Sequence, residues 1–253
     1  MIIFFKKIWL AIRFAYAILK LLINPNNLNP IFRVREFLGH KSFQFAINKT
    51  KANPKIKELM DTRYLADGPY DLDELLKLPE DSLGHVFAKH MKHFKLDVVY
   101  YPDDIKDSKT SDISWIRQRS RETHDVWHCI LGYKPDHLGE IKISSFFLQQ
   151  TNAPLPAIIV LIGILVAVIK KPHLINELFE SIIEGWSDAK TSTPLLEVKW
   201  EEQWETPISE LRESLNLSQR EETYEQEKMK TLEKRELTRF EGYEAMSKGA
   251  INA

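Results

Sequence analysis

Along most of the chain, apolar residues recur at spacings of three and four rather than two, which is the period of an amphipathic helix. Turn dipeptides are scarce, and only nine glycines occur in 253 residues, so few sharp reversals interrupt these segments. The pattern predicts an all-α protein. We expect a single multi-helix domain over residues 25–215, an N-terminal amphipathic helix over residues 1–24 and a polar C-terminal helical extension over residues 216–253.

The N-terminal stretch reads as a helix that ends at Asn24 and Pro25. Lys6, Arg13 and Lys20 follow one another at intervals of seven and give an otherwise apolar helix a narrow basic stripe. Such a helix suits an anionic membrane surface, where it buries its apolar side and keeps its charges among the headgroups. We therefore expect it to lie on a membrane. A helix docked on the core, a targeting peptide and a true membrane span are the alternatives.

A second apolar block runs over residues 157–169 between two prolines and two lysines. Thirteen helical residues extend about 20 Å, which is less than the roughly twenty residues needed to cross a bilayer. Because the block is apolar on every side, it must be surrounded. Either it is a central core helix, or it lines an apolar tunnel or packs on lipid.

The chain after about Leu217 is dense in both charge signs and poor in aliphatic residues. Opposite charges at helical spacing, such as Glu225 with Lys228 and Glu244 with Lys248, would stabilise a solvated helix modestly. This extension is best explained as a mobile tail or a partner-binding helix.

Composition excludes several classes of function. The formal net charge of −1 gives no reason to expect nucleic acid, and one cysteine, Cys129, cannot form a disulfide framework. The chain has no glycine-rich phosphate loop, no Gly-x-Ser-x-Gly motif and no dinucleotide-binding fingerprint. We therefore expect neither a nucleotide nor a flavin cofactor.

Four metal-ligand groups occur within seventeen residues: His124, Asp125, His128 and Glu140. On one helix, the first three lie within about 100° of each other, so they can lean toward one point. Gly132 is expected to end that helix, after which the chain folds back and Glu140 opens the next helix. Imidazole with carboxylate suits zinc, iron or manganese. The alternative is that the two histidines are simply polar residues at the edge of the core.

Arg117 and Arg121 share a helix face with the two histidines and would bring guanidinium groups beside the metal. Because arginine matches carboxylate and phosphate oxygens in paired geometry, the two could hold an anionic headgroup; plain solvation is the alternative. Arg119 points elsewhere, and we expect it to pair with a carboxylate or to face water. His90 and His93 lie among lysines that would repel a cation, so a metal role is disfavoured there.

The stretch from Arg119 to Asp125, continued by Leu131, Gly132, Gly139 and Glu140, closely resembles the coenzyme Q biosynthesis protein 4 family, whose signature is HDxxH-x11-E. The spacing holds here without insertion. Leu78 to Gly84 upstream and Gln150-Thr151 with Pro154 or Pro156 downstream agree with the family. The resemblance covers roughly residues 25–205. Pro135 and His137, in the loop before Glu140, depart from the pattern, and the C-terminal extension lies outside it.

The resemblance implies a ubiquinone biosynthesis protein, peripheral to a membrane, on the cytoplasmic face in a bacterium or on the matrix face of the inner membrane in a mitochondrion. A divalent metal (zinc, iron, manganese or magnesium) held by the four ligands would act in oxidative decarboxylation of a polyprenylated hydroxybenzoate, a lyase-type step. The alternatives are a noncatalytic prenyl-lipid-binding scaffold and a phosphohydrolase of prenyl phosphates. The expected partners are a polyprenylated aromatic or prenyl-phosphate lipid, the membrane surface, other quinone-biosynthesis enzymes and further copies of this chain.

Overall fold

A computed structural model describes residues 40–66, 70–98, 111–220 and 222, together with residues 9, 12, 13, 15–20 and 23 near the N-terminus. These described residues form helices and no strand; the one β-type contact among them is an isolated bridge between Ser82 and Pro207. The prediction of a single all-α domain is confirmed. The predicted extension over residues 216–253 lies almost entirely outside the described residues.

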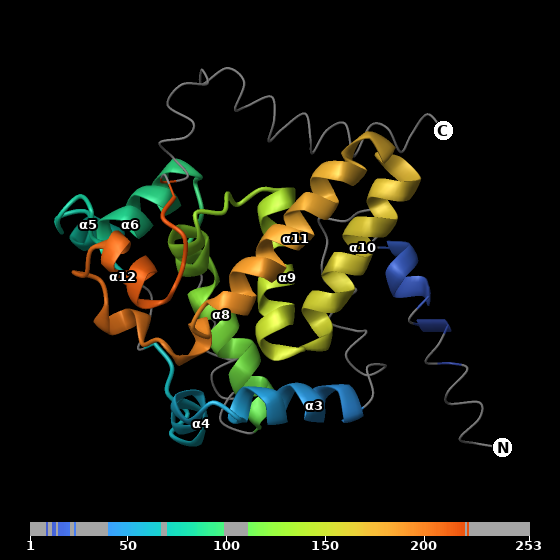
Figure 1. The fold of residues 1–253 in the computed structure, drawn as a ribbon, viewed down its shortest axis with the longest axis horizontal. Helices are drawn as coiled ribbons and strands as arrows, with labels where there is room; N and C mark the ends of the chain where they lie inside the picture. The colour runs from blue at the N-terminus through green and yellow to red at the C-terminus, as the bar shows by residue number, and fades with distance from the viewer. Residues whose placement is uncertain are drawn as a thin grey trace.

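The helices are arranged around α8, which runs through the middle of the molecule (Figure 1). Helices α9, α10 and α11 pack together on one side of α8, whereas α5, α6 and α12 lie on the other, and α3 and α4 cross one end. The bounds are α3 His40–Lys51, α4 Pro54–Asp61, α5 Leu72–Leu75, α6 Leu83–His93, α8 Asp112–Leu131, α9 His137–Thr151, α10 Pro154–Lys170, α11 Ile175–Thr191 and α12 Ile208–Ser214, with 3-10 turns η1 Pro172–Leu174, η2 Leu195–Glu197 and η3 Trp200–Glu202.

Short polar side chains fix where the central helices begin. Ser82, Ser111 and Asp136 each accept a hydrogen bond from a backbone N–H in the first turn of α6, α8 and α9, respectively. Helix α10 has no such side-chain cap and instead begins with Pro154, which lacks the N–H group that a cap would have to satisfy. The sequence therefore specifies where each of these four helices begins.

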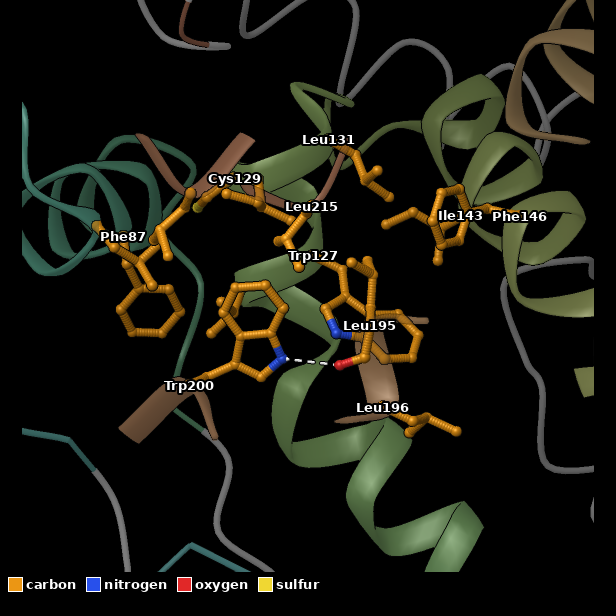
Figure 2. Packing of buried hydrophobic residues seen from close by; sticks show 14 of the residues in the cluster. Phe87, Trp127, Cys129, Leu131, Ile143, Phe146, Leu195, Leu196, Trp200 and Leu215 are labelled. Carbon is orange, nitrogen blue, oxygen red and sulfur yellow. Dashed lines mark hydrogen bonds between the residues drawn. The ribbon is translucent and has the colours of Figure 1, made fainter. Parts of the chain in front are cut away.

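The main core surrounds α8. Figure 2 shows Trp127 of α8 and Trp200 of η3 in the same cluster of buried side chains as Leu195, whose carbonyl accepts a hydrogen bond of 3.2 Å from the Trp200 indole. Both indoles are almost fully buried, and so is the indole of Trp115, which lies nearer the start of α8. Large rings from α8 and from the C-terminal turns thus lock the central helix in place.

Helix α10 is not a central core helix, although it carries the most apolar sequence of the chain. Leu161, Val168 and Ile169 are 46%, 56% and 62% exposed. Only five residues of α10 are buried. Of the two interpretations of this block, burial in the core is wrong, and a surface that can pack on lipid fits the exposure. No helix among the described residues is both long and apolar enough to cross a bilayer.

The described positions near the N-terminus are helical, and this helix lies beside α10 (Figure 1). Ala17 packs against Ile158 and Ile162 of α10, so one side of the helix is docked on the domain. Another side carries large apolar residues that are between 54% and 62% exposed, namely Trp9, Ile12, Tyr16, Leu19 and Ile23. Docking and an exposed apolar face are therefore combined in one helix.

Arg119 of α8 anchors the helix through a buried ion network. Its guanidinium is fully buried and donates to Glu122 at 2.6 Å, to both carboxylate oxygens of Glu201 and to the Val198 carbonyl at 2.7 Å. The expectation that Arg119 pairs with a carboxylate is confirmed. Removing one member of such a buried pair leaves the other charges without compensation.

Arg119→Ala should therefore lower the free energy of unfolding by about 3–5 kcal/mol, because Glu122 and Glu201 lose their buried cation. Urea denaturation followed by circular dichroism measures this loss. The matched control is Lys77→Ala, which breaks an exposed pair with Glu74 and should cost no more than about 1 kcal/mol. Equal effects of the two substitutions would contradict the anchoring role of Arg119.

Candidate metal centre

The two histidines lie in the last two turns of α8, and the way this helix ends sets the orientation of the second. Gly132 ends the helix in the left-handed conformation, at φ 65°, as the sequence predicted. This turn brings the carbonyl of Tyr133 to 2.9 Å from Nδ1 of His128, which must donate to it. The hydrogen bond fixes the tautomer of His128 and leaves the lone pair of Nε2 available for a metal.

Glu140 lies in the first turn of α9, as predicted, and a close backbone approach places it there. A Cβ atom on Gly139 would lie 1.8 Å from the Lys134 carbonyl oxygen, so only glycine fits. Asp136 caps the helix by accepting a hydrogen bond of 2.9 Å from the Gly139 N–H. The short connection between α8 and α9 therefore returns the chain tightly enough for the Glu140 carboxylate to reach both histidines.

His124, His128 and Glu140 offer ligand atoms that all lie within 4.8 Å of one another. Nε2 of His128 is 3.2 Å from Nε2 of His124 and 3.1 Å from Oε1 of Glu140, and Nε2 of His124 is 3.3 Å from Oε2 of Glu140. The His128 side chain is fully buried, whereas that of Glu140 is 45% exposed. The three side chains thus form a triangle with one side open to solvent, in which Glu140 meets His128 through Oε1 and His124 through Oε2.

These separations fit a divalent ion. A tetrahedral ion with bonds of about 2.0–2.1 Å spaces its ligand atoms about 3.3–3.4 Å apart, close to the 3.2 Å between the two histidine Nε2 atoms and to the 3.1 and 3.3 Å from each histidine to its own oxygen of Glu140. Two imidazoles and one carboxylate that leave a fourth position open form the ligand set of a catalytic rather than a structural site. Iron and manganese accept the same donors. The residues therefore fit a metal, and the geometry does not distinguish among these ions.

The charges of the triangle stabilise one another. Burial disfavours the charged form of His124, but hydrogen bonding to Glu140 and the carboxylate charges of Glu140 and Asp125 raise its pKa above the ordinary value. Burial also favours neutral Glu140, yet hydrogen bonds and charge from His124 and His128 hold its pKa far below the usual range. A metal ion would have to compete with protons for the donor atoms of this cluster.

The other predicted site residues lie nearby without joining the triangle. Asp125 is half-buried, and its charge acts on His124, but it does not belong to the group of three close donors. Arg121 lies about 4.5 Å and Arg117 about 10.5 Å along the axis of α8 before His124, and both are half-buried. It remains a prediction that Asp125 is a metal ligand and that Arg117 and Arg121 bind an anionic headgroup.

Two arginines near the C-terminal end of the described chain support the end of α8, and the sequence analysis missed both. Arg212 donates to the carbonyls of Cys129 and Ile130 at 3.0 Å each, and Arg220 donates to that of Leu131 at 2.7 Å. The carbonyls of Ile130 and Leu131 lie in the last turn, where an α-helix leaves carbonyls without a partner of its own, and the Cys129 carbonyl also accepts a hydrogen bond from the Gly132 N–H. Since the contacts join positions more than eighty residues apart, no local pattern in the sequence reveals them.

Gly139→Ala should push the start of α9 away from Lys134 and displace Glu140. We expect zinc affinity, measured by isothermal titration calorimetry, to fall at least about tenfold, because the carboxylate no longer completes the triangle. The control is Gly163→Ala on α10, where an added Cβ would meet the flexible end of Ile141 instead of backbone. Undiminished zinc affinity in Gly139→Ala would contradict the positioning argument.

Comparison with known proteins agrees with the fold and with the family resemblance. The family described as "Coenzyme Q (ubiquinone) biosynthesis protein Coq4" matches residues 2–221. The ubiquinone biosynthesis protein COQ4 homologue of rat mitochondria is 27% identical over 78% of this chain and 74% of its own length. The human homologue is 25% identical over 78% of this chain and 74% of its own.

A similar structure has also been solved. The crystal structure of a candidate ubiquinone biosynthesis protein from Nostoc punctiforme is 28% identical, has a TM-score of 0.69 and covers 82% of this chain and 98% of its own. The match of the family to nearly the whole described chain confirms the resemblance carried by the HDxxH-x11-E motif. The chain belongs to the Coq4 family of coenzyme Q (ubiquinone) biosynthesis proteins.

Proposed function

We propose that this chain acts in the oxidative decarboxylation of a polyprenylated hydroxybenzoate whose head lies at a divalent-metal centre. The observation that carries the proposal is the close approach of His124, His128 and Glu140, whose two imidazole nitrogens lie 3.2 Å apart and 3.1–3.3 Å from one or the other carboxylate oxygen, with one side open. Asp125, on the same helix, is a further candidate ligand. Zinc, iron, manganese and magnesium are the candidate ions.

Each residue of the site has a distinct task in this proposal. His128 is buried and oriented by the Tyr133 carbonyl, so it gives a fixed donor, whereas Glu140 supplies the negative charge and the exposed side of the site. Arg117 and Arg121 would attract the ring carboxylate, which carries the opposite charge. A bound divalent ion would supply Lewis-acid or oxygen-activating chemistry. In the overall change, the ring carboxyl group leaves as carbon dioxide, a hydroxyl group derived from water takes its place, and the two electrons released reduce dioxygen to hydrogen peroxide.

A second candidate function is a noncatalytic scaffold that presents the prenylated intermediate to other quinone-biosynthesis enzymes. The observation that favours it is the amount of apolar surface on three neighbouring helices. Besides the N-terminal helix and α10, helix α11 exposes Phe179, Ile183 and Trp186, which share one face at spacings of four and three. Exposed apolar patches of this kind mark contacts with proteins, lipids or membranes.

A peripheral position on a membrane fits both candidates. The N-terminal helix, α10 and α11 present apolar side chains, while Lys20, Lys170 and Lys171 lie among them and can reach anionic headgroups. The relatives from rat and human are named as mitochondrial. The corresponding position would be the matrix face of the inner membrane in a mitochondrion, or the cytoplasmic face in a bacterium.

Purified, metal-loaded protein supplied with a prenylated hydroxybenzoate and oxygen should release carbon dioxide and form the hydroxylated ring, as measured by mass spectrometry. The double variant with His124→Ala and His128→Ala should lose this turnover at least about a hundredfold, because two of the three close donors are gone. The control is His173→Ala, an exposed histidine on η1.

The same experiment separates the two candidate functions. If metal and lipid are both bound by the wild-type protein and the lipid remains unchanged, the enzyme proposal fails. A double variant that still captures its partner enzymes but no longer orients the lipid would then support the scaffold.

Replacing Phe179, Ile183 and Trp186 together by serine should reduce binding to vesicles that contain anionic lipid, because the apolar side chains that would enter the bilayer are lost. Flotation of the vesicles through a density gradient measures the bound fraction. The control is Phe45→Ser on α3, which is 60% exposed and lies on a different part of the molecule. Equal flotation of the triple variant and the control would contradict membrane contact through α11.

A further inference from the structure

Helix α6 carries three histidines that the proposed site does not use, and they have different surroundings. Nδ1 of His85 contacts the carbonyls of Leu76 and Leu78 at 3.0 and 3.1 Å, where it holds a turn. His93 is half-buried near the end of the helix. His90, in contrast, is fully buried and lies on the side of α6 that packs against α8.

The ring of His90 lies against the ring of His128. Their centroids are 6.0 Å apart and their planes are inclined by only 22°, so the two imidazoles are stacked. Phe94 packs on His90 in turn, with centroids 4.8 Å apart. The His128 imidazole therefore lies next to the ring of His90, which itself packs against the ring of Phe94 at the end of α6.

The contact with His90 restricts a rotation of the His128 ring that the hydrogen bond to Tyr133 leaves possible. The bond from Nδ1 of His128 fixes the tautomer and one point of the ring, but the χ2 torsion of histidine has a broad energy minimum. Because a hydrogen bond tolerates a range of angles, the ring can still rotate to some extent about its Cβ–Cγ bond. A fully buried, nearly parallel ring with its centroid 6.0 Å away limits this rotation, and the direction of Nε2 toward His124 and Glu140 depends on the plane of the ring.

We infer that His90 is a positioning residue of the metal centre, which sets the plane of the His128 ring by stacking on it. This role rests on the proposed metal site. Among the described residues, His90 is not one of the donors that lie within 4.8 Å of one another, so it acts through His128 instead of as a ligand. A side chain with a flat ring but no nitrogen should therefore be able to take over the positioning role of His90.

The test uses Co²⁺ bound to the full chain, because the visible absorption of Co²⁺ responds to the geometry of its ligands. His90→Ala removes the stacked ring and should weaken Co²⁺ binding about tenfold and change the spectrum. His90→Phe keeps a flat ring and should restore affinity to within about threefold of the wild type, together with the wild-type spectrum.

Two controls separate positioning from general loss of stability. Met91→Ala also empties space in the core under α6, but Met91 makes no ring contact with His128, so the variant should melt earlier and keep the Co²⁺ spectrum. His93→Ala removes a histidine from the same helix and should behave as the wild type.

Three outcomes would overturn the inference in distinguishable ways. An unchanged affinity and spectrum in His90→Ala would show that the stacked ring is not needed. A His90→Phe variant as impaired as His90→Ala would show that the nitrogen atoms matter instead of the flat face. Wild-type protein that does not bind Co²⁺ would remove the proposed metal centre itself, and the role of His90 with it.

Discussion

Three side chains from two helices must bring their donor atoms to little more than 3 Å from one another, and the junction of α8 and α9 makes this approach possible. Each part of the junction contributes one constraint. Gly132 turns the chain out of α8, Gly139 lets the backbone pass within contact of Lys134, and Asp136 starts α9 so that Glu140 faces back. A larger residue at Gly139 would open the junction.

The surroundings of the junction hold it rigid from several directions. Arg212 and Arg220 satisfy the last carbonyls of α8, and Arg220 also pairs with Asp188 at 2.7 Å. Asp188 in turn accepts the hydroxyl hydrogen bond of Tyr133, the residue whose carbonyl orients His128. An ordered chain of contacts therefore runs from α11 and the C-terminal segment to the metal-facing imidazole.

Local chemistry in the sequence was enough to predict the parts of this site that lie close together along the chain. Helical spacing placed His124 and His128 on one face, and Gly132 marked the end of their helix, because both signals act within a few residues. The pattern could not decide whether Asp125 would join them, since a residue 100° away around the helix can lean toward the site or away from it. In the structure Asp125 lies outside the group of three close donors.

Features that depend on distant residues were not predictable in the same way. The ring of His90 meets His128 only because α6 packs on α8, and the apolar sequence of α10 could not decide between a position in the core and the partly exposed position of this helix. Helix α9 connects the candidate metal centre with the exposed apolar helices. It carries Glu140 of the candidate metal centre in its first turn, and it packs so closely on α11 that a Cβ on Gly185 would lie 2.1 Å from the Lys142 carbonyl oxygen. The candidate metal centre and the exposed helix α11 are thus joined by direct backbone packing.

X-ray absorption spectroscopy of the zinc-loaded protein tests the central claim most directly, because it reports the atoms bound to the ion. The account predicts a shell of nitrogen and oxygen atoms at about 2.0–2.2 Å together with the scattering pattern of two imidazole rings. A spectrum of an ion surrounded by oxygen alone, without imidazole, would contradict it.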